Sequence, residues 1–332
     1  MKDSNLQHST GPSIRRRSIV MAAAGACTVG AAWGQAAWNP QRPLKLIVTY
    51  PPGGGADVTA RAFTDQLGSK LGQAVVIDNR GGAGGAIGAE VAYRAAPDGY
   101  TLLWGNADIL TIAPHLFTKL PYKPNEFVPI GPTAAVAFVL CGRGDIGVKT
   151  FAEVLELGRK KELSFASWGN GSPGHVGSEM FKTMGKVPSV LTVPYQGTAP
   201  AAQALLAGQV DMMYLPSPLF LAMETKVTTF AAAGKQRYDR FKQVPTMAEF
   251  GVPVDLEVWQ GLFAPPGTPK PVIDRIASAL AEVSADPAIR KKIEELGVVP
   301  LASSQEDFAK SIAPDAARWG EIMRTAQVKP QA

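Results

Sequence analysis

The sequence has few of the residues that form cross-links or hold metal ions. It contains two cysteines, Cys27 and Cys141, and three histidines. Cys27 falls in an N-terminal segment that we expect to be removed, so the mature chain would keep Cys141 alone, which excludes an internal disulfide and a thiolate metal cluster. Cys141 lies in an apolar run and is interpreted as a buried, inert thiol. No group of His, Cys and Glu has metal-ligand spacing, and we expect neither a metal nor a cofactor.

The motifs of two enzyme classes are also missing. A hydrolase elbow needs Gly-x-Ser-x-Gly, but Asn170 stands two residues before Ser172. A dinucleotide site needs Gly-x-Gly-x-x-Gly, and the third glycine is replaced by Ile87 in the run from Gly82 and by Val58 in the run from Gly53. We therefore expect no catalytic residues and treat an exported α/β hydrolase as the weaker alternative to a binding protein.

Charge is scarce and unevenly placed. Charged residues make up 18% of the chain and hydrophobic residues 46%, as in a folded globular protein. The formal net charge of +5 falls to +2 when residues 1–36 are removed, because Lys2 and Arg15–Arg17 outnumber Asp3 there. The basic balance therefore owes much to the N-terminal segment, and we expect no nucleic-acid partner.

The first 36 residues have the pattern of an export signal. Arg15–Arg17 precede an apolar run from Ile19 to Trp33, which is too short to span a membrane, and Gly34-Gln35-Ala36 supplies small residues for cleavage. The arginines resemble a twin-arginine signal imperfectly, so Tat and Sec export both stay open. Ala24-Gly25-Ala26-Cys27 lacks the leucine of a lipobox. We expect an exported protein with residues 1–36 removed.

Strands alternate with helices through the rest of the chain. The 332 residues suit two domains better than one, because single cores stop growing at about 250–300 residues. The repeated strand–turn–helix order predicts a parallel, doubly wound sheet in each of two lobes. Predicted strands cover residues 44–48, 74–78, 101–104, 163–166, 190–193, 209–214 and 258–264.

The chain is expected to cross between the lobes at least twice. We place the first crossing after the apolar stretch 128–141 and the return at strand 258–264. The predicted limits are 37–142 plus 265–332 for lobe 1 and 143–264 for lobe 2. Three helix starts are predicted from capping patterns: Thr268-Pro269, Asp286-Pro287 and the capping box Ser303-x-x-Glu306.

The first strand ends in a glycine-rich turn without basic residues. Pro51-Pro52-Gly53-Gly54-Gly55 separates this strand from a helix that we expect to begin near Asp57. Backbone N–H groups at a helix start, together with the helix dipole, favour an anion such as a carboxylate or phosphate. The alternative is a plain turn in which the glycines only permit positive φ.

Six blocks in order resemble a known family, the extracytoplasmic solute receptors of the tripartite tricarboxylate transporter system, also called Bug receptors. The blocks are Tyr50-Pro-Pro-Gly-Gly-Gly-Ala-Asp57-x-x-x-Arg61, Asp78-Asn-Arg-x-Gly-Ala-Gly-Gly85, Pro97-Asp-Gly-Tyr-Thr-Leu-Leu103, Gly169-Asn-Gly-Ser-x-x-His175, Pro194-Tyr-Gln-Gly-Thr-Ala-Pro200 and Gly208-Gln-Val-Asp211. The match runs from about Pro43 to the C-terminus. The chain departs from the family pattern at Trp104-Gly-Asn-Ala-Asp108 and at Trp168.

The resemblance implies an α/β, two-lobe periplasmic-binding-protein (flytrap) fold, with the ligand in the cleft between the lobes. It implies a monomeric receptor that captures a small carboxylate, aliphatic or aromatic, and delivers it to the membrane permease subunits of a tripartite transporter. Family members hold the carboxylate largely through loop backbone groups and bridging water. A carboxylate-sensing receptor for signalling would use the same fold and remains an alternative.

The expected first-lobe contacts lie mainly in the glycine turn. Gly53, Gly54 and Gly55 would bind through backbone N–H groups, and Tyr50 opens the same block. Asp57 could orient the loop or bond the ligand, but a helix N-cap role is favoured.

Two further first-lobe positions follow the third strand. Asn106 is expected to contact polar groups of the ligand. Asp108 would repel a second carboxylate, so it either faces solvent or favours a ligand that bears a donor.

Arg61 is expected to pair with Asp57 across one helical turn.

In the second lobe, the expected contacts lie in two turns. Ser172 could donate its hydroxyl or serve as a helix N-cap, and a lone histidine such as His175 is more often structural than functional. Tyr195, Gly197 and Thr198 form the other contact loop, with N–H and hydroxyl donors at a helix start.

Two second-lobe side chains complete the predicted site. Trp168 could lay its ring along a ligand or cap the core. Asp211 could tether a loop or accept a hydrogen bond from a ligand hydroxyl.

Overall fold

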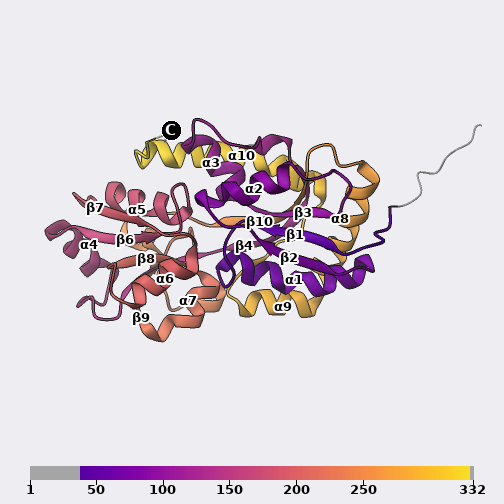
Figure 1. Ribbon diagram of the computed structural model, residues 1–332. Helices are drawn as coiled ribbons and strands as arrows, with labels where there is room; N and C mark the ends of the chain where they lie inside the picture. Colours follow the sequence, from indigo (N-terminus) through magenta and orange to yellow (C-terminus); the bar gives the residue numbers. More distant parts are fainter. Residues whose placement is uncertain (1–37, 330–332) are drawn as a thin grey trace, which may run out of the picture. The chain divides into compact units, whose positions relative to one another are not determined.

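Two mixed β-sheets, each flanked by helices, form the framework of the computed structural model, which describes residues 38–329 (Figure 1). The predicted export signal, including Cys27, lies outside the described residues. Strand order is β11-β4-β10-β3-β1-β2 in the first sheet and β7-β6-β8-β5-β9 in the second. We call each sheet with its helices a lobe, so the two-lobe α/β prediction is confirmed.

The strands of the first sheet come from both ends of the described chain. They are β1 Leu44–Val48, β2 Val75–Asn79, β3 Thr101–Asn106, β4 Val128–Val136, β10 Val258–Ala264 and β11 Val299–Pro300. The second sheet is built from β5 Phe138–Arg143, β6 Leu163–Ser167, β7 Val190–Pro194, β8 Met212–Pro216 and β9 Val227–Ala232. Strands β9 and β11 were not predicted, and β4 and β5 were expected only as the apolar stretch 128–141.

Helices cover both faces of each sheet. Figure 1 shows α1 and α2 on opposite sides of β1–β3, and α5 and α6 on opposite sides of β6 and β8. The α-helices are α1 Gly55–Leu71, α2 Ala86–Tyr93, α3 Ala113–Leu116, α4 Phe151–Lys160, α5 Pro173–Met184, α6 Thr198–Leu206, α7 Ser217–Met223, α8 Lys270–Ala285, α9 Pro287–Glu295 and α10 Gln305–Thr325.

The sheets are mixed, whereas the sequence predicted parallel ones. Strand β1 is parallel to β2 and β3, but β10 runs antiparallel to β3 and β4. In the second sheet β6 is parallel to β7 and β8, and β5 is antiparallel to β8 and β9. Strands β5 and β10 enter from the other lobe, so they run in the reverse direction and begin at the crevice where β1, β3, β6 and β8 end. The two-residue strand β11 is also antiparallel to its neighbour β4.

The crossings divide the chain at other residues than the predicted lobe limits. The apolar stretch 128–141 is two strands of different sheets, and only Ala137 separates β4 from β5. The return segment 233–257 leads from β9 to β10. Strand β5 thus belongs to the second sheet and β10 to the first, because a strand is assigned by its hydrogen-bonded neighbours and not by the turn after it.

Side-chain caps explain the starts of α4, α5, α9 and α10. Thr150 and Glu153 form a capping box at α4, and Asp286 caps α9 through Ala288 N–H, as predicted for α9. Two predicted starts are wrong by one residue. The N-cap of α8 is Pro269, while the Thr268 hydroxyl donates to Pro265 O. The N-cap of α10 is Ser304, whose hydroxyl accepts from Asp307 N–H, so the Ser303–Glu306 box does not form.

Candidate functional site between the lobes

Two adjoining cavities lie where the carboxyl ends of strands from both lobes meet. The larger has a volume of about 300 Å³ and the smaller about 30 Å³. Tyr50 from the first lobe and Trp168 from the second line both cavities. The smaller volume holds about two water molecules, whereas the larger is in the range of small-molecule sites.

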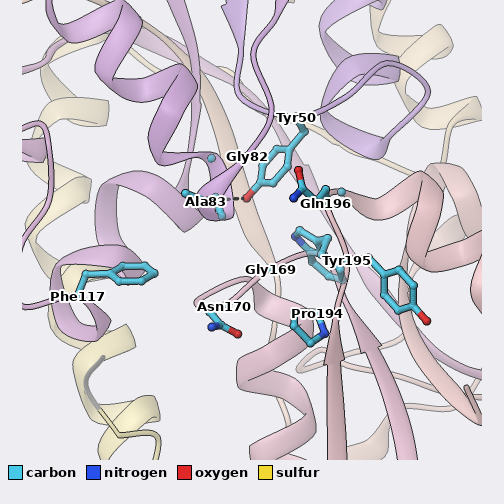
Figure 2. A pocket seen from close by; sticks show the side chains of 13 residues that line it. Tyr50, Gly82, Ala83, Phe117, Gly169, Asn170, Pro194, Tyr195 and Gln196 are labelled. Carbon is cyan, nitrogen blue, oxygen red and sulfur yellow. Dashed lines mark hydrogen bonds between the residues drawn. The ribbon is translucent and has the colours of Figure 1, made fainter. Parts of the chain in front are cut away.

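Backbone and uncharged side chains line the larger cavity. Figure 2 shows the Tyr50 ring between the lobes, with its hydroxyl directed at the 82–85 turn, where it donates to Gly84 O at 3.2 Å. The first lobe contributes Tyr50, Gly82, Ala83, Gly84, Gly85 and Phe117, and the second contributes Trp168, Gly169, Asn170, Pro194, Tyr195, Gln196 and Gly197. No charged side chain is in this lining.

Among the described residues that line the smaller cavity, Asp108 is the one carboxylate. Its lining is Tyr50, Gly55, Ala56, Asn106, Asp108, Val136, Phe138, Trp168, Thr198, Pro216, Val258 and Gln260. Asp108 is 5% exposed and Asn106 is 4% exposed. Neither cavity is lined by a lysine, arginine or histidine.

Asp108 begins a π-helical turn, η2 Asp108–Ile112, directly after β3. Its Oδ2 atom accepts a hydrogen bond from the Tyr50 hydroxyl at 2.6 Å and a long one from Trp168 Nε1 at 3.4 Å. Burial raises the pKa of Asp108 to about 6, because desolvation outweighs the two hydrogen bonds to the ionised form. Burial and the neighbouring carboxylate also raise the pKa of Tyr50. Trp168 is held in place by stacking on Phe138, with ring centroids 5.4 Å apart.

The glycine turn before α1 is fixed by Asp57. This carboxylate accepts hydrogen bonds from Gly53 N–H (2.9 Å), Arg61 Nε (2.9 Å) and Asn79 Nδ2 (3.0 Å). Burial raises the pKa of Asp57, but these hydrogen bonds outweigh burial and leave it below its ordinary value. Asp57 is therefore a buried tether of the loop. The N-cap of α1 is Gly54, so the favoured N-cap role of Asp57 is wrong, while its pairing with Arg61 is confirmed.

Helices α1 and α6, from different lobes, begin beside each other. Gly55 N–H donates to Thr198 Oγ1 at 3.4 Å. The N-caps of these helices, Gly54 and Gly197, supply no side-chain hydrogen bond to the first turn. A Cβ atom at Gly54 would lie 2.6 Å from Thr198 Oγ1, so the absence of a side chain there permits the close approach.

The structure gathers most of the predicted site residues at the two cavities. Seven line a cavity wall: Tyr50, Gly55, Asn106, Trp168, Tyr195, Gly197 and Thr198. Gly53, Gly54 and Asp57 belong to the turn that carries Gly55 but are not in either lining. In Figure 2 the Tyr195 hydroxyl points away from the other labelled side chains, so this residue lines the cavity without directing its hydroxyl into it.

Ser172 and His175 lie outside both linings. The Ser172 hydroxyl donates to Gly169 O at 2.7 Å and accepts from His175 N–H at 3.3 Å, which makes it the N-cap of α5. His175 Nδ1 accepts from Gly171 N–H at 3.1 Å, and burial lowers the pKa of this imidazole. The side chains of Ser172 and His175 therefore form hydrogen bonds within their own turn.

Asp211 lies before the first residue of β8, at the end of the strand away from the other candidate residues. It precedes β8, whose last residue, Pro216, lines the smaller cavity. Its carboxylate accepts hydrogen bonds from the N–H and hydroxyl of Ser164, both at 3.0 Å, and from Arg143 Nε at 3.3 Å. The expectation that Asp211 lies close to the contact loops is therefore wrong, because the start of β8 faces away from the crevice.

Several lining residues were not among the predicted contacts. Asp108 was noted, but the alternative that it faces solvent is wrong, since it is buried. Gln260 stands opposite Asn106 in the antiparallel β10–β3 register, and its Oε1 accepts from Trp104 Nε1 at 3.0 Å. No local pattern identifies Gln260, because its position depends on pairing across 154 residues of chain. The 82–85 turn was a glycine block in the sequence and could have been included.

Within residues 38–329 we find no helix with the length and apolarity needed to cross a membrane. In the same residues no three His, Cys, Asp or Glu side chains gather as a metal site.

Comparison with known proteins gives consistent matches over most of the chain. A protein of Bordetella pertussis, described as a UPF0065 protein, is 33% identical over 300 residues, covering 88% of this chain and 92% of the relative. Protein BugT of the same organism is 31% identical over 297 residues, covering 87% and 91%.

Solved structures with the same fold include periplasmic binding proteins. BugD is 34% identical with a TM-score of 0.84, covering 88% of this chain and all of that one (100%). The R. palustris protein Rpa4515, solved with adipate, is 29% identical with a TM-score of 0.85, covering 88% and 99%. MatC from Rhodopseudomonas palustris, solved with bound malate, is 30% identical with a TM-score of 0.80, covering 85% and 99%.

The family described as tripartite tricarboxylate transporter family receptor matches residues 59–328, which include most of α1, both sheets except β1, and nearly all of the cavity walls. On this match and these relatives, the chain belongs to the receptor family of the tripartite tricarboxylate transporters.

Proposed function

We propose that this protein binds a small carboxylate between its two lobes and delivers it to the membrane permease of a tripartite transporter. The observation that carries the proposal is the meeting of two uncapped helix starts from different lobes, α1 at Gly55 and α6 at Thr198, in the wall of a cation-free cavity.

The chemistry of the cavity walls suits an anion held by neutral donors. The first N–H groups of a helix have no partner within the helix, and the dipole places partial positive charge there. Ala83, Gly84, Gln196 and Gly197 also line the larger cavity and carry peptide N–H groups, whereas the N–H groups of Gly85 and Tyr195 donate to Gly82 O and Ser167 O. A carboxylate held this way touches both lobes, so its binding favours the closed arrangement over an open one.

Relatives with bound acids support this ligand class. Adipate in Rpa4515 and malate in MatC are both small carboxylates, and both proteins share the fold over nearly their whole length. A cavity of about 300 Å³ accommodates a molecule of that size.

We further propose that the protein is exported, monomeric and without catalytic activity. The nucleophile that the hydrolase alternative requires has no base: the Ser172 hydroxyl donates to a backbone carbonyl, and His175 Nδ1 is already an acceptor for Gly171 N–H. Family membership supports a role with a transporter, and residues 1–36 keep their interpretation as an export signal.

A thermal-shift screen over aliphatic and aromatic carboxylates tests the proposal. A ligand at 100 times its Kd stabilises the folded state by about 2.7 kcal/mol, so a true ligand should raise the Tm by about 5–10 °C. The methyl ester or amide of the same acid is the control and should give no shift. If no acid shifts the Tm, the carboxylate assignment is wrong, and if chromatography finds the ligand chemically changed after incubation, the receptor is an enzyme.

A further inference from the structure

Asp108 is a buried carboxylate in the wall of the smaller cavity. Asp108 takes part in none of the ion pairs formed by residues 38–329, although it is only 5% exposed. Its Oδ2 atom is occupied by Tyr50 and Trp168, but its Oδ1 atom has neither a hydrogen-bond partner nor exposure to water. A buried acceptor left in this state is unfavourable, so Asp108 needs a donor that the described residues do not supply.

A second acceptor without a partner lies in the same cavity wall. Asn106 is 4% exposed, and its Oδ1 atom is also buried without a hydrogen bond. Both residues line the smaller cavity together with Gly55 and Thr198 of the two helix starts. Residues that carry unpaired acceptors and residues that carry helix-start donors therefore line the same cavity.

The charge of the site restricts the chemical class of the ligand further. A carboxylate bound at the helix starts brings a second negative charge into a site whose only charged side chain is Asp108. Two anions in a shared site that lacks a cation disfavour each other. A ligand with a cationic group removes that conflict.

The number of donors favours an ammonium group over a hydroxyl. An ammonium group carries three donors and no acceptor, so it can satisfy both Asp108 and Asn106. A hydroxyl carries one donor and leaves either the charge or one acceptor unmatched.

We propose that the ligand is a carboxylate that also bears an ammonium group, with Asp108 as its binding partner for the cation and Asn106 beside it. This inference rests on the proposed function, because it assumes that the carboxylate end lies at the helix starts. It makes Asp108 a specificity-determining residue of the receptor.

The surroundings of Asp108 give the proposal a pH signature. The ionisable groups that act on it are Tyr50, through a hydrogen bond, and Tyr122; burial and the Asp108 charge raise the pKa of both phenols. Asp108 itself has a pKa of about 6, so it is the group of this cluster that titrates between pH 5 and 7. An ammonium ligand binds the ionised form, and its affinity falls as Asp108 becomes protonated. A ligand without a cation binds the neutral form better, and its affinity rises.

Triplets of acids with one carbon skeleton test the proposal by calorimetry. Suitable sets are L-alanine, L-lactate and propionate; 4-aminobutyrate, 4-hydroxybutyrate and butyrate; and L-phenylalanine, phenyllactate and phenylpropanoate. In the triplet that fits the cavity, the ammonium member should bind at least about tenfold more tightly than the other two, the equivalent of one pKa unit of interaction. Equal or tighter binding of the hydroxyl or unsubstituted member overturns the proposal.

The variant Asp108→Asn removes the charge while keeping an oxygen that can accept from Tyr50. It should lose the preference for the ammonium member and bind the unsubstituted acid at least as well as the original protein does. Asp315→Asn is the matched control, because Asp315 is a carboxylate of α10 outside both cavities that accepts from Thr111 and Trp259. A preference that survives Asp108→Asn contradicts the proposal.

The unmodified protein provides a measurement that does not depend on folding of a variant. Between pH 7 and 5 its affinity for the ammonium member should fall about tenfold, because Asp108 has a pKa near 6. A flat or opposite profile overturns the role of Asp108. Binding of plain carboxylates without any preference for ammonium leaves the proposed function intact and removes this inference, whereas failure of every triplet together with every acid of the thermal-shift screen removes both.

Discussion

Helices α1 and α5 both follow a strand and a glycine-rich turn, yet their first turns are satisfied in different ways. At α5, Ser172 caps the helix and His175 accepts from Gly171 N–H. At α1, the N-cap is Gly54, which has no side chain to offer, and the helix start lies in the cavity wall. Helix α6 resembles α1, with Gly197 as its N-cap.

The two helices differ in whether a side chain of the same turn accepts from the N–H groups at the helix start or leaves them able to bind a ligand. A capping side chain satisfies one of the donors at a helix start. A glycine cap leaves those donors for another molecule or for the opposite lobe, as the Gly55 bond to Thr198 Oγ1 illustrates. Two turns with similar composition can therefore differ in function because of one side-chain oxygen.

A side chain added at Gly54, the N-cap of α1, should give the largest effect. In Gly54→Val, the new side chain meets Thr198 Oγ1, which would be 2.6 Å from Cβ, and prevents the lobes from closing on a ligand. Because overpacking of close contacts costs about 1–3 kcal/mol, affinity for the carboxylate found in the screen should fall about 10- to 100-fold by calorimetry.

The control for this change is Gly144→Val. Gly144 also has a φ that other residues adopt, its nearest contact is Lys226 O at 3.3 Å, and it lines neither cavity. Its affinity should stay within about twofold. Normal binding by Gly54→Val would show that the α1 turn does not form part of the site.

Asp211→Asn should reduce stability and leave affinity unchanged. Burial raises the pKa of Asp211, but hydrogen bonds from Ser164, together with Lys161 and Arg143, outweigh burial and lower it. Loss of these charge-assisted bonds should lower the free energy of unfolding in urea by about 1–2 kcal/mol at pH 7.

The pH dependence of this effect follows from the lowered pKa. The contribution of Asp211 is present above its unfolded pKa of about 4 and disappears as the pH falls through the folded value. The difference in the free energy of unfolding between the variant and the original protein should therefore shrink as the pH falls below about 4. A tenfold loss of ligand affinity would instead show that Asp211 belongs to the ligand-binding site.

Ser172→Ala should have the smallest of these effects. Removal of the N-cap of α5 should lower the free energy of unfolding by about 1 kcal/mol, with ligand affinity within about twofold. Ser303→Ala is the control, since Ser304 and not Ser303 caps α10, and it should change stability by less than about 0.5 kcal/mol. If Ser172→Ala loses binding but not stability, its hydroxyl contacts the ligand, and the distinction between capped and uncapped turns fails.

The predictions from local sequence succeeded where neighbouring residues carry the information. Strand β1, helix α1 and the Asp286 cap follow from apolar periodicity and capping chemistry within a few residues. The pairing of Arg61 with Asp57 follows from their spacing on one helix. The error of one residue at α10 arose where two adjacent serines could both act as the cap. At α8 the Thr268 hydroxyl donates to Pro265 O instead of capping the helix.

Predictions failed where distant segments decide the outcome. The run 128–141 is uniformly apolar, so its division at Ala137 between two sheets is not visible in the pattern. The antiparallel direction of β10 follows from its entry out of the second lobe, and the position of Gln260 opposite Asn106 follows from that pairing. Asp211 was misplaced because its block in the sequence does not tell which end of β8 faces the crevice.

The sequence by itself determined the alternation of strands and helices, the glycine turn without basic residues and the family of the chain, because each depends on short-range pattern or on ordered blocks. Only the tertiary structure decided which turns converge, which helix starts remain uncapped by side chains and that Asp108 is buried without a countercharge. These features depend on contacts between residues far apart in the chain, where the burial of a carboxylate and the approach of two helix starts are set by packing and not by neighbouring residues.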